Sequence, residues 1–416
     1  MALFAGRATI VVRHDPTWEL ELAGFSNRGP STGVHALPQI RAFVFRDSAT
    51  QQQLAVISGD YCGWDSDFVT GIRRKLKSLG TESIISVTHT HSAPATYHSV
   101  GDFTGAVDPR YVELVQACIL EAVAAAQKDM SEVTSVAVTH STLHGNFTMN
   151  RSTLRERQTD EGARMWLDKR LTRDTPAAVL ADVDRGIALV RFGRPGGDLV
   201  LANFACHPVV EGRDNLTCSR DFIGPLLSQI ERELDTGSGD VTAMFLQGAA
   251  GDVNPAVFEF GLVAAERFGR AIGAEMACAM CEGAFPVSEG LAFREVPVRL
   301  ENVDGSYHEA VVSCLLIGGQ AIVTVPGELY HELGLAIKAG FDLPPIVACY
   351  SNGSVGYLPN RERLERSEAY GNDTGIRTTA ASLFAPGYGN RTGVPAPGSS
   401  EHLVDTIREL LTKMLA

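Results

Sequence analysis

Short apolar runs rich in β-branched residues alternate with longer runs at helical spacing along most of this 416-residue chain. Residues 83–87 and 241–246 are typical of buried strands, whereas 111–128 and 262–280 have the length and the apolar spacing of helices. Such alternation predicts an α/β fold, with mixed β-sheets flanked by helices. No linker-like stretch divides the chain, so we expect a single domain over residues 1–416.

Polar residues follow five of the strand-like runs at the point where each run ends. The five segments are 88–92, 206–208, 247–255, 326–328 and 351–357. In α/β folds the loops after the strands collect functional groups on a rigid base. Two of these segments carry His and one carries Glu, and imidazole and carboxylate are standard ligands of zinc. The pattern predicts a metal site at the strand ends.

The pair His89 and His91 belongs to the first of these segments. In an extended chain, residues two apart point the same way, so both imidazoles are expected to face one cavity. One would bind metal and the other would contact substrate or move a proton. Taken alone the pair is a weak signal, because histidines also serve ordinary surface and core roles.

Charge and hydrophobicity argue against several classes of partner. The chain has 36 Lys and Arg against 49 Asp and Glu, a net charge of -13, whereas nucleic acids and anionic membranes attract basic surfaces. No run approaches the roughly 18–20 apolar residues that span a bilayer, and the first residues lack the pattern of a signal peptide. We therefore expect a cytoplasmic protein that acts on a small molecule, without membrane insertion and without nucleic acid. The sequence leaves monomer and homo-oligomer open.

Eight cysteines are scattered along the chain. In a chain of this size without a signal peptide, buried free thiols are more typical than a disulfide framework. Cys278 and Cys281 form a CxxC inside a helical run with no second pair. This context favours helix packing over a metal or redox role.

The polar segments resemble motifs of the neutral ceramidases, in the same order along the chain. VTHTHSAP at 87–94 is similar to their THTHSGPGG, NRS at 150–152 to NRSP, and FACHP at 204–208 with SRDFIG at 219–224 to FAxHP and SDxxG. QGAAGDVNP at 247–255 resembles QSNxGDVSPN, PGEL at 326–329 resembles their PGEL, and 351–357 resembles the segment with their metal-binding tyrosine. As a collinear set over almost the whole chain, these matches are specific.

The resemblance implies a zinc-dependent hydrolase in which a zinc-bound water attacks the amide that joins a fatty acid to a sphingoid base. The implied zinc ligands are His89, His207, Glu328 and Tyr357. The other implied site residues are His91 beside the activated water, Arg151 as a cation, and Asp252 and Asp221 as hydrogen-bonding groups. Zinc lowers the pKa of bound water towards about 7 and polarises a carbonyl, which suits this chemistry.

Three departures from the family pattern bear on the substrate and the nucleophile. Asn254 stands where the family has a serine, which excludes a serine nucleophile and leaves water. Residues 93–95 replace the Gly-Pro-Gly-Gly after the histidine pair. The family usually carries a secretion signal and a C-terminal immunoglobulin-like domain, so we expect this chain to be a shorter version with a substrate that is ceramide-like or smaller.

Several alternatives remain open at this point. The same scaffold suits a metal-dependent esterase, a lactonase, or a hydrolase or lyase of a sugar derivative, and a non-catalytic binding protein is a third class. Manganese or iron would accept the same ligands as zinc.

Some other polar residues are given structural roles. His331 lies three residues after Glu328, and such an ExxH pair can bind metal, but the family does not use it. His140 and His144 are assigned to surface or hydrogen-bonding roles. Tyr370 is the alternative to Tyr357 as phenol ligand. The segments 146–185 and 371–399 are polar or rich in Gly and Pro, and we expect them to be active-site loops.

Overall fold

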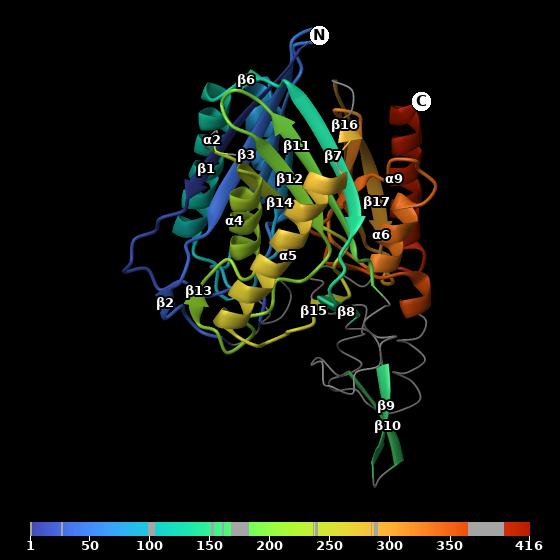
Figure 1. Cartoon of the computed structure of the whole chain (residues 1–416). Coiled ribbons are helices and arrows are strands. Elements are labelled where there is room, and N and C mark those ends of the chain that lie inside the picture. The colour runs from blue at the N-terminus through green and yellow to red at the C-terminus, as the bar shows by residue number, and fades with distance from the viewer. Residues whose placement is uncertain are drawn as a thin grey trace.

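Three β-sheets with helices on their outer faces form the framework of the computed structural model (Figure 1). The structure describes residues 2–25, 28–98, 105–150, 154–159, 162–167, 183–235, 237, 240–283, 285–286, 290–364 and 395–416. The predicted α/β class, with mixed sheets flanked by helices, is confirmed. Among the helices in these ranges, none combines the length and the hydropathy that a bilayer crossing requires.

The first sheet is covered by two helices on its outer face. Its strands, in spatial order, are β5 (Glu82–Val87), β4 (Gln53–Gly59), β3 (Gln39–Asp47), β1 (Leu3–Val11) and β6 (Ser131–Glu132). The covering helices are α1 (Ser66–Ser78) and α2 (Pro109–Lys128). Along β3, Ile40, Ala42 and Val44 share a core cluster with these helices, while Phe43 and Phe45 belong to the central core. This alternation is the expected period of two for a strand buried on both faces.

The second sheet has the same layered plan. Its strands, in spatial order, are β14 (Thr242–Gln247), β12 (Leu199–Phe204), β11 (Gly186–Gly193), β7 (Ser135–Thr142) and β16 (Phe285–Pro286). Helices α4 (Ile223–Leu234) and α5 (Leu262–Gly283) cover it, as Figure 1 shows. Helix α4 buries Ile223, Leu226, Ile230 and Leu234, the single stripe expected of an amphipathic helix.

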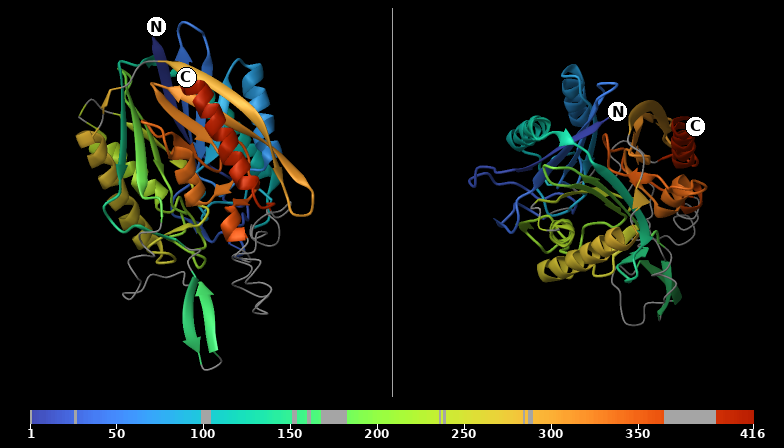
Figure 2. Two further views of the ribbon diagram at one scale, coloured as in Figure 1. Left: turned by 90° about the vertical axis from the view of Figure 1, so that its right-hand side faces the viewer. Right: turned by 45° about the horizontal axis from the view of Figure 1, so that its top comes forward.

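The third sheet and its helices complete the molecule. Its strands, in spatial order, are β17 (Leu291–Glu301), β18 (Tyr307–Ile317), β19 (Gln320–Thr324) and β21 (Ile346–Ala348). Helices α6 (His331–Lys338) and α9 (Ser399–Leu415) pack on it. The helices thus lie in three groups around the sheets (Figure 2).

A central core joins the three sheets and fixes the positions of their strand ends. Phe45 of the first sheet and Phe192 of the second have ring centroids 4.9 Å apart, and Ile322 of the third sheet belongs to the same cluster. The neighbours β4 and β5, β12 and β14, and β19 and β21 are parallel pairs. Because functional loops gather at the carboxyl ends of such strands, this topology places the polar segments at one end of the molecule.

The structure differs from some of the predictions, and others concern residues that it does not describe. Cys278 and Cys281 are exposed on α5, so the interpretation of these two thiols as buried packing residues was wrong. Within the expected loop 146–185, residues 154–159 and 162–167 form the paired strands β9 and β10. Arg151 and Tyr370 lie outside the described residues.

Candidate metal centre

The polar strand ends meet around Gln247, the fully buried last residue of β14. Its side-chain nitrogen donates to the carbonyls of Thr88 and Cys206 at 3.1 and 2.9 Å. Its backbone carbonyl accepts the N–H of Cys349 at 2.8 Å. One residue therefore ties together the chain ends that follow β5, β12 and β21, and residues far apart in the sequence become neighbours here.

Three ligand atoms converge at this point, from His89, His207 and Glu328. Glu328 Oε2 lies 3.5 Å from His89 Nε2 and 3.3 Å from His207 Nε2. The three ligand atoms all lie within 4.8 Å of one another. Bonds of about 2.0–2.2 Å from nitrogen and oxygen to zinc fit a single ion among atoms at such separations. The set is therefore suited to one metal ion.

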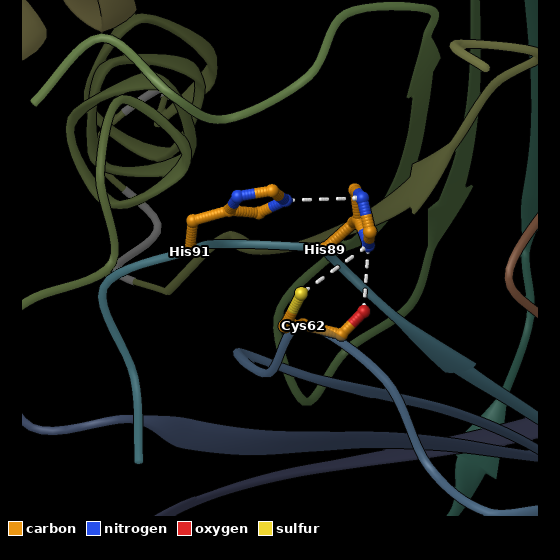
Figure 3. Close-up of side chains that lie close together, drawn as sticks. All are labelled: Cys62, His89 and His91. Carbon is orange, nitrogen blue, oxygen red and sulfur yellow. Dashed lines mark hydrogen bonds between the residues drawn. The ribbon is translucent and has the colours of Figure 1, made fainter. Parts of the chain in front are cut away.

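The other ring nitrogen of each histidine is held by a backbone carbonyl. His89 Nδ1 donates to Cys62 O at 2.6 Å, and His207 Nδ1 donates to Ala250 O at 2.6 Å. Figure 3 shows the first of these bonds. This assignment turns both Nε2 lone pairs toward Glu328, and metal-binding histidines nearly always have such a second partner.

Burial and charge act on these ligands in opposite directions. Burial raises the pKa of the Glu328 carboxyl, but His89 and His207 together hold it well below 4.5. Burial lowers the pKa of His89, but Cys62 and Glu328 raise it to about 10. A buried carboxylate between two imidazoles requires positive charge at this point, which a proton or a bound cation supplies. Metal binding here would compete with protons.

His91 lies beside the cluster, with Nε2 3.2 Å from His89 Nε2 (Figure 3). The two rings meet because His89 has a left-handed φ of 68°, and not because the segment is extended as the sequence argument supposed. Burial, followed by the neighbouring His89 and His207, lowers the pKa of His91 well below 6.5. A Cβ on Gly24, which has φ +89°, would lie 2.3 Å from the His91 ring, so glycine is required there.

Asp252 and His331 form a buried pair that joins the loop after β14 to the start of α6, just after Glu328. The Asp252 carboxylate accepts the backbone N–H of His331 at 2.8 Å and its Nδ1–H at 2.7 Å. The preceding Gly251 lies so close to Glu328 that a Cβ would be 2.3 Å from the Glu328 carbonyl oxygen. The loop that orients His207 is thereby fixed against the segment that carries Glu328.

Comparison with known proteins identifies the family to which the chain belongs. The sequence matches the family model described as neutral/alkaline non-lysosomal ceramidase, N-terminal, over residues 13–279. The chain belongs to this family. His89 and His207 lie inside the matched residues, whereas Glu328 and Tyr357 lie beyond them.

Solved ceramidases share the fold. The structure resembles neutral ceramidase from Pseudomonas aeruginosa with a TM-score of 0.72 and 14% identity, over 99% of this chain and 75% of that one. It resembles a ceramidase complexed with C2 with a TM-score of 0.67 and 14% identity, over 95% of this chain and 76% of that one. No curated protein sequence gives a significant match.

Two tyrosines of this ceramidase-family chain lie next to Glu328, one by strand pairing and one by its hydroxyl. Tyr357 begins β22 (Tyr357–Leu358), where it stands opposite Glu328 of the parallel strand β20 (Glu328–Leu329). Tyr350 was missed by the sequence argument: its ring stacks on His89 with centroids 4.1 Å apart, and its hydroxyl donates to Glu328 Oε2 at 3.4 Å. Its place as the last residue of a strand-like run, directly before a polar segment, was the signal.

Asp221 braces the loop that follows His207. Its carboxylate accepts the backbone N–H groups of Glu211 at 2.9 Å and Phe222 at 2.7 Å. Burial, with the neighbouring Glu211 second, raises the pKa of Asp221 to about 8. The resemblance implied a hydrogen-bonding role for this residue, and the structure places its bonds within the loop.

Cys62 is a second residue whose position the sequence did not indicate. Its sulfur lies 3.8 Å from His89 Nδ1 and 3.4 Å from the hydroxyl of Tyr97. His89, Tyr97 and Cys62 line a small pocket, which Trp64 and Glu328 also border. The pocket gives Glu328, whose side chain is 13% exposed, a connection to space outside the cluster.

Proposed function

We propose that this ceramidase-family chain is a zinc-dependent hydrolase that cleaves an amide bond in an N-acyl substrate, ceramide-like or smaller. The observation that carries the proposal is the convergence of His89 Nε2, His207 Nε2 and the Glu328 carboxylate, with both Nδ1 atoms held by carbonyls. Asn254 at the family's serine position supports water as the nucleophile.

The proposed ligands are His89, His207 and Glu328, with the phenol of Tyr357 as the fourth. A bound zinc would polarise the scissile carbonyl and lower the pKa of water towards about 7. Tyr350 would hold the Glu328 carboxylate in place through its hydroxyl, 3.4 Å away. Three or four protein ligands with a position left for substrate are typical of catalytic zinc.

His91 is proposed to move the proton. Its ring is neutral near pH 7, because burial and the nearby His89 and His207 hold its pKa well below 6.5. A neutral imidazole can accept a proton as water attacks and deliver it to the leaving amine. Such transfer is typically worth about 10²–10⁴-fold in rate. Arg151 is proposed as a cation for the substrate, and Asp252 as the group that fixes two ligands.

A panel of matched substrates tests this proposal. The zinc-loaded protein would be given short N-acyl amino alcohols, the corresponding esters, lactones and glycosides, and products would be quantified by chromatography. We expect amide hydrolysis that stops after chelation and returns with added zinc. If only esters or lactones were hydrolysed, the protein would be an esterase or lactonase instead of an amidase. If only sugar derivatives reacted, it would be an enzyme of sugar derivatives. No turnover by a zinc-loaded protein would favour a binding protein.

A further inference from the structure

Asn254 carries a buried hydrogen-bond acceptor. The residue is 2% exposed, and its Oδ1 accepts no hydrogen bond from the residues that the structure describes. Most buried polar atoms in native proteins have a partner, because an unsatisfied buried acceptor loses its bonds to water without replacement. Such an atom next to a functional site is a marker for a ligand that brings the missing donor.

The register of β15 (Val253–Pro255) places this amide on the side of the metal centre. Asn254 stands directly opposite Met149 of the antiparallel strand β8 (Thr148–Asn150). Side chains opposite each other in such a pair project from the same face. Met149 packs in one apolar cluster with Phe25, whose ring lies edge-on to His91 with centroids 5.0 Å apart.

The neighbouring residue, Val253, fixes the backbone of Asn254 against the metal centre. The carbonyl of Val253 accepts the backbone N–H of His207 at 3.0 Å and lies 3.2 Å from its Nδ1. Because Val253 and Asn254 are consecutive in a strand, their side chains leave on opposite faces. The backbone of Asn254 is therefore held next to His207, and its side chain projects from the face that it shares with Met149.

We infer that Asn254 Oδ1 accepts a hydrogen bond from the N–H of the scissile secondary amide. The inference rests on the proposed function, since it assumes a carbonyl compound bound at the metal centre. In a secondary amide the N–H is attached to the carbon that water attacks, so a group beside the centre reaches it. An ester presents an oxygen there, whose lone pairs would face those of Oδ1. The site would therefore select amides against esters and lactones.

Binding of two compounds that differ only in this N–H tests the inference. The probes are N-hexanoylethanolamine and its N-methyl derivative, titrated calorimetrically at 5 °C into the zinc-loaded full chain, with product formation followed chromatographically in the same samples. We expect wild type to bind the N–H compound about tenfold to a hundredfold more tightly, the range expected when a buried acceptor is left unpaired. Equal binding of the two compounds, or no binding of either, would overturn the inference.

Variants of Asn254 separate this bond from a steric effect of the methyl group. In Asn254→Ala the two compounds should bind within about twofold of each other, because the acceptor is gone from both complexes. Asn254→Asp keeps an acceptor and should keep the preference; zinc content and circular dichroism confirm that each variant folds. An unchanged preference in Asn254→Ala would assign it to other groups and refute the inference. Tighter binding of the N–H compound without its hydrolysis would support the hydrogen bond to Asn254 and refute the amidase function. Hydrolysis without tighter binding of the N–H compound would support the amidase function and refute the hydrogen bond.

Discussion

Two clusters of largely buried charged or titratable groups in this molecule differ in what balances them. The ion-pair cluster consists of Arg41, Asp60, Arg220 and Glu231. In it each carboxylate has its own arginine, at 2.5 Å for Arg41–Glu231 and 2.7 Å for Arg220–Asp60. In the metal centre, formed by His89, His207 and Glu328, one carboxylate faces two imidazole nitrogens that are not permanently charged.

The difference shows that buried charge by itself does not mark a site. The ion-pair cluster connects the first sheet to the layer of α4, since Arg41 is on β3 and Glu231 is on α4, and each of its carboxylates pairs with an arginine of the protein. In the metal centre the ligand atoms point at a common position, and the Nδ1 atoms of both histidines already bond to backbone carbonyls. The direction of the atoms, rather than their charge, distinguishes a ligand site from a structural brace.

His207→Ala should have the largest effect on the metal centre. The variant keeps only part of the ligand set, and zinc is seldom held well by so few ligands, so we expect loss of both zinc and hydrolysis. The matched control is His140→Ala, since His140 lies on β7 and its Nε2 bonds to Gln320 of β19 at 2.8 Å. A His207→Ala protein with full zinc and full rate would remove this residue from the centre.

Arg220→Met should break the ion-pair cluster and leave the metal centre intact. Asp60 would remain buried without its cation, which typically costs about 3–5 kcal/mol of unfolding free energy. Urea unfolding measures this loss, and zinc affinity measured on the folded variant should match wild type. Arg232→Met is the control, because that side chain is 61% exposed and pairs with Glu233 on the surface. Unchanged stability with weaker zinc binding would reverse the roles given to the two clusters.

Asp252→Asn tests whether the metal centre depends on its supporting bonds. The amide keeps an acceptor for the His331 N–H but loses the charge and one acceptor of the carboxylate, which bonds both the backbone and Nδ1 of His331. Loss of such a support typically weakens metal binding by about 10–100-fold. Competition with a chromogenic chelator measures the affinity, with the exposed Asp304→Asn as control. Wild-type affinity in Asp252→Asn would show that the pair is only structural.

Glu211→Gln should have the smallest effect, on the pH dependence of stability. The pKa of Asp221 is raised to about 8 by burial and then by Glu211, against about 3.9 in the unfolded chain. Between these values the folded state binds a proton that the unfolded state lacks, so stability falls as the pH rises through this window. Without Glu211 the pKa of Asp221 drops and the fall is shallower.

Thermal unfolding at pH 6 and pH 9 measures this change. The difference in Tm between the two pH values should shrink by about 1–2 °C in Glu211→Gln, since a free-energy change near 1 kcal/mol shifts Tm by only a few degrees in a large domain. An unchanged or larger difference would show that Glu211 does not raise the pKa of Asp221.

The sequence predicted the alternation of strands and helices and the segments that meet at the strand ends. These features are local: apolar period and polar termini can be read over a few residues, as for β3 and α4. Strand β7 and the long hairpin of β17 and β18 were not predicted. These strands mix exposed and buried residues without a clear period: in β7, for example, Val136, Val138 and Thr139 are buried, whereas Ser135 and Thr142 are exposed.

The sequence predicted less of the site than of the fold. His89, His207 and Glu328 were proposed through a family resemblance, and the structure brings their ligand atoms together. Tyr350 ends a strand-like run directly before a polar segment, which is a local signal. Its stacking on His89 and the position of Cys62 beside that ring depend on long-range packing. His89 has a left-handed backbone conformation and not the extended one that was predicted, because such a conformation depends on the surrounding structure.

The metal content of the purified protein, measured by plasma mass spectrometry, tests the central claim most directly. We predict about one zinc per chain, bound as isolated or taken up when zinc is supplied and excess metal is removed. One equivalent of manganese or iron would support the metal centre but show that its ion is not zinc. No bound metal under any of these conditions would contradict the proposed centre, and the cluster of His89, His207 and Glu328 would then be a structural brace like the ion-pair cluster.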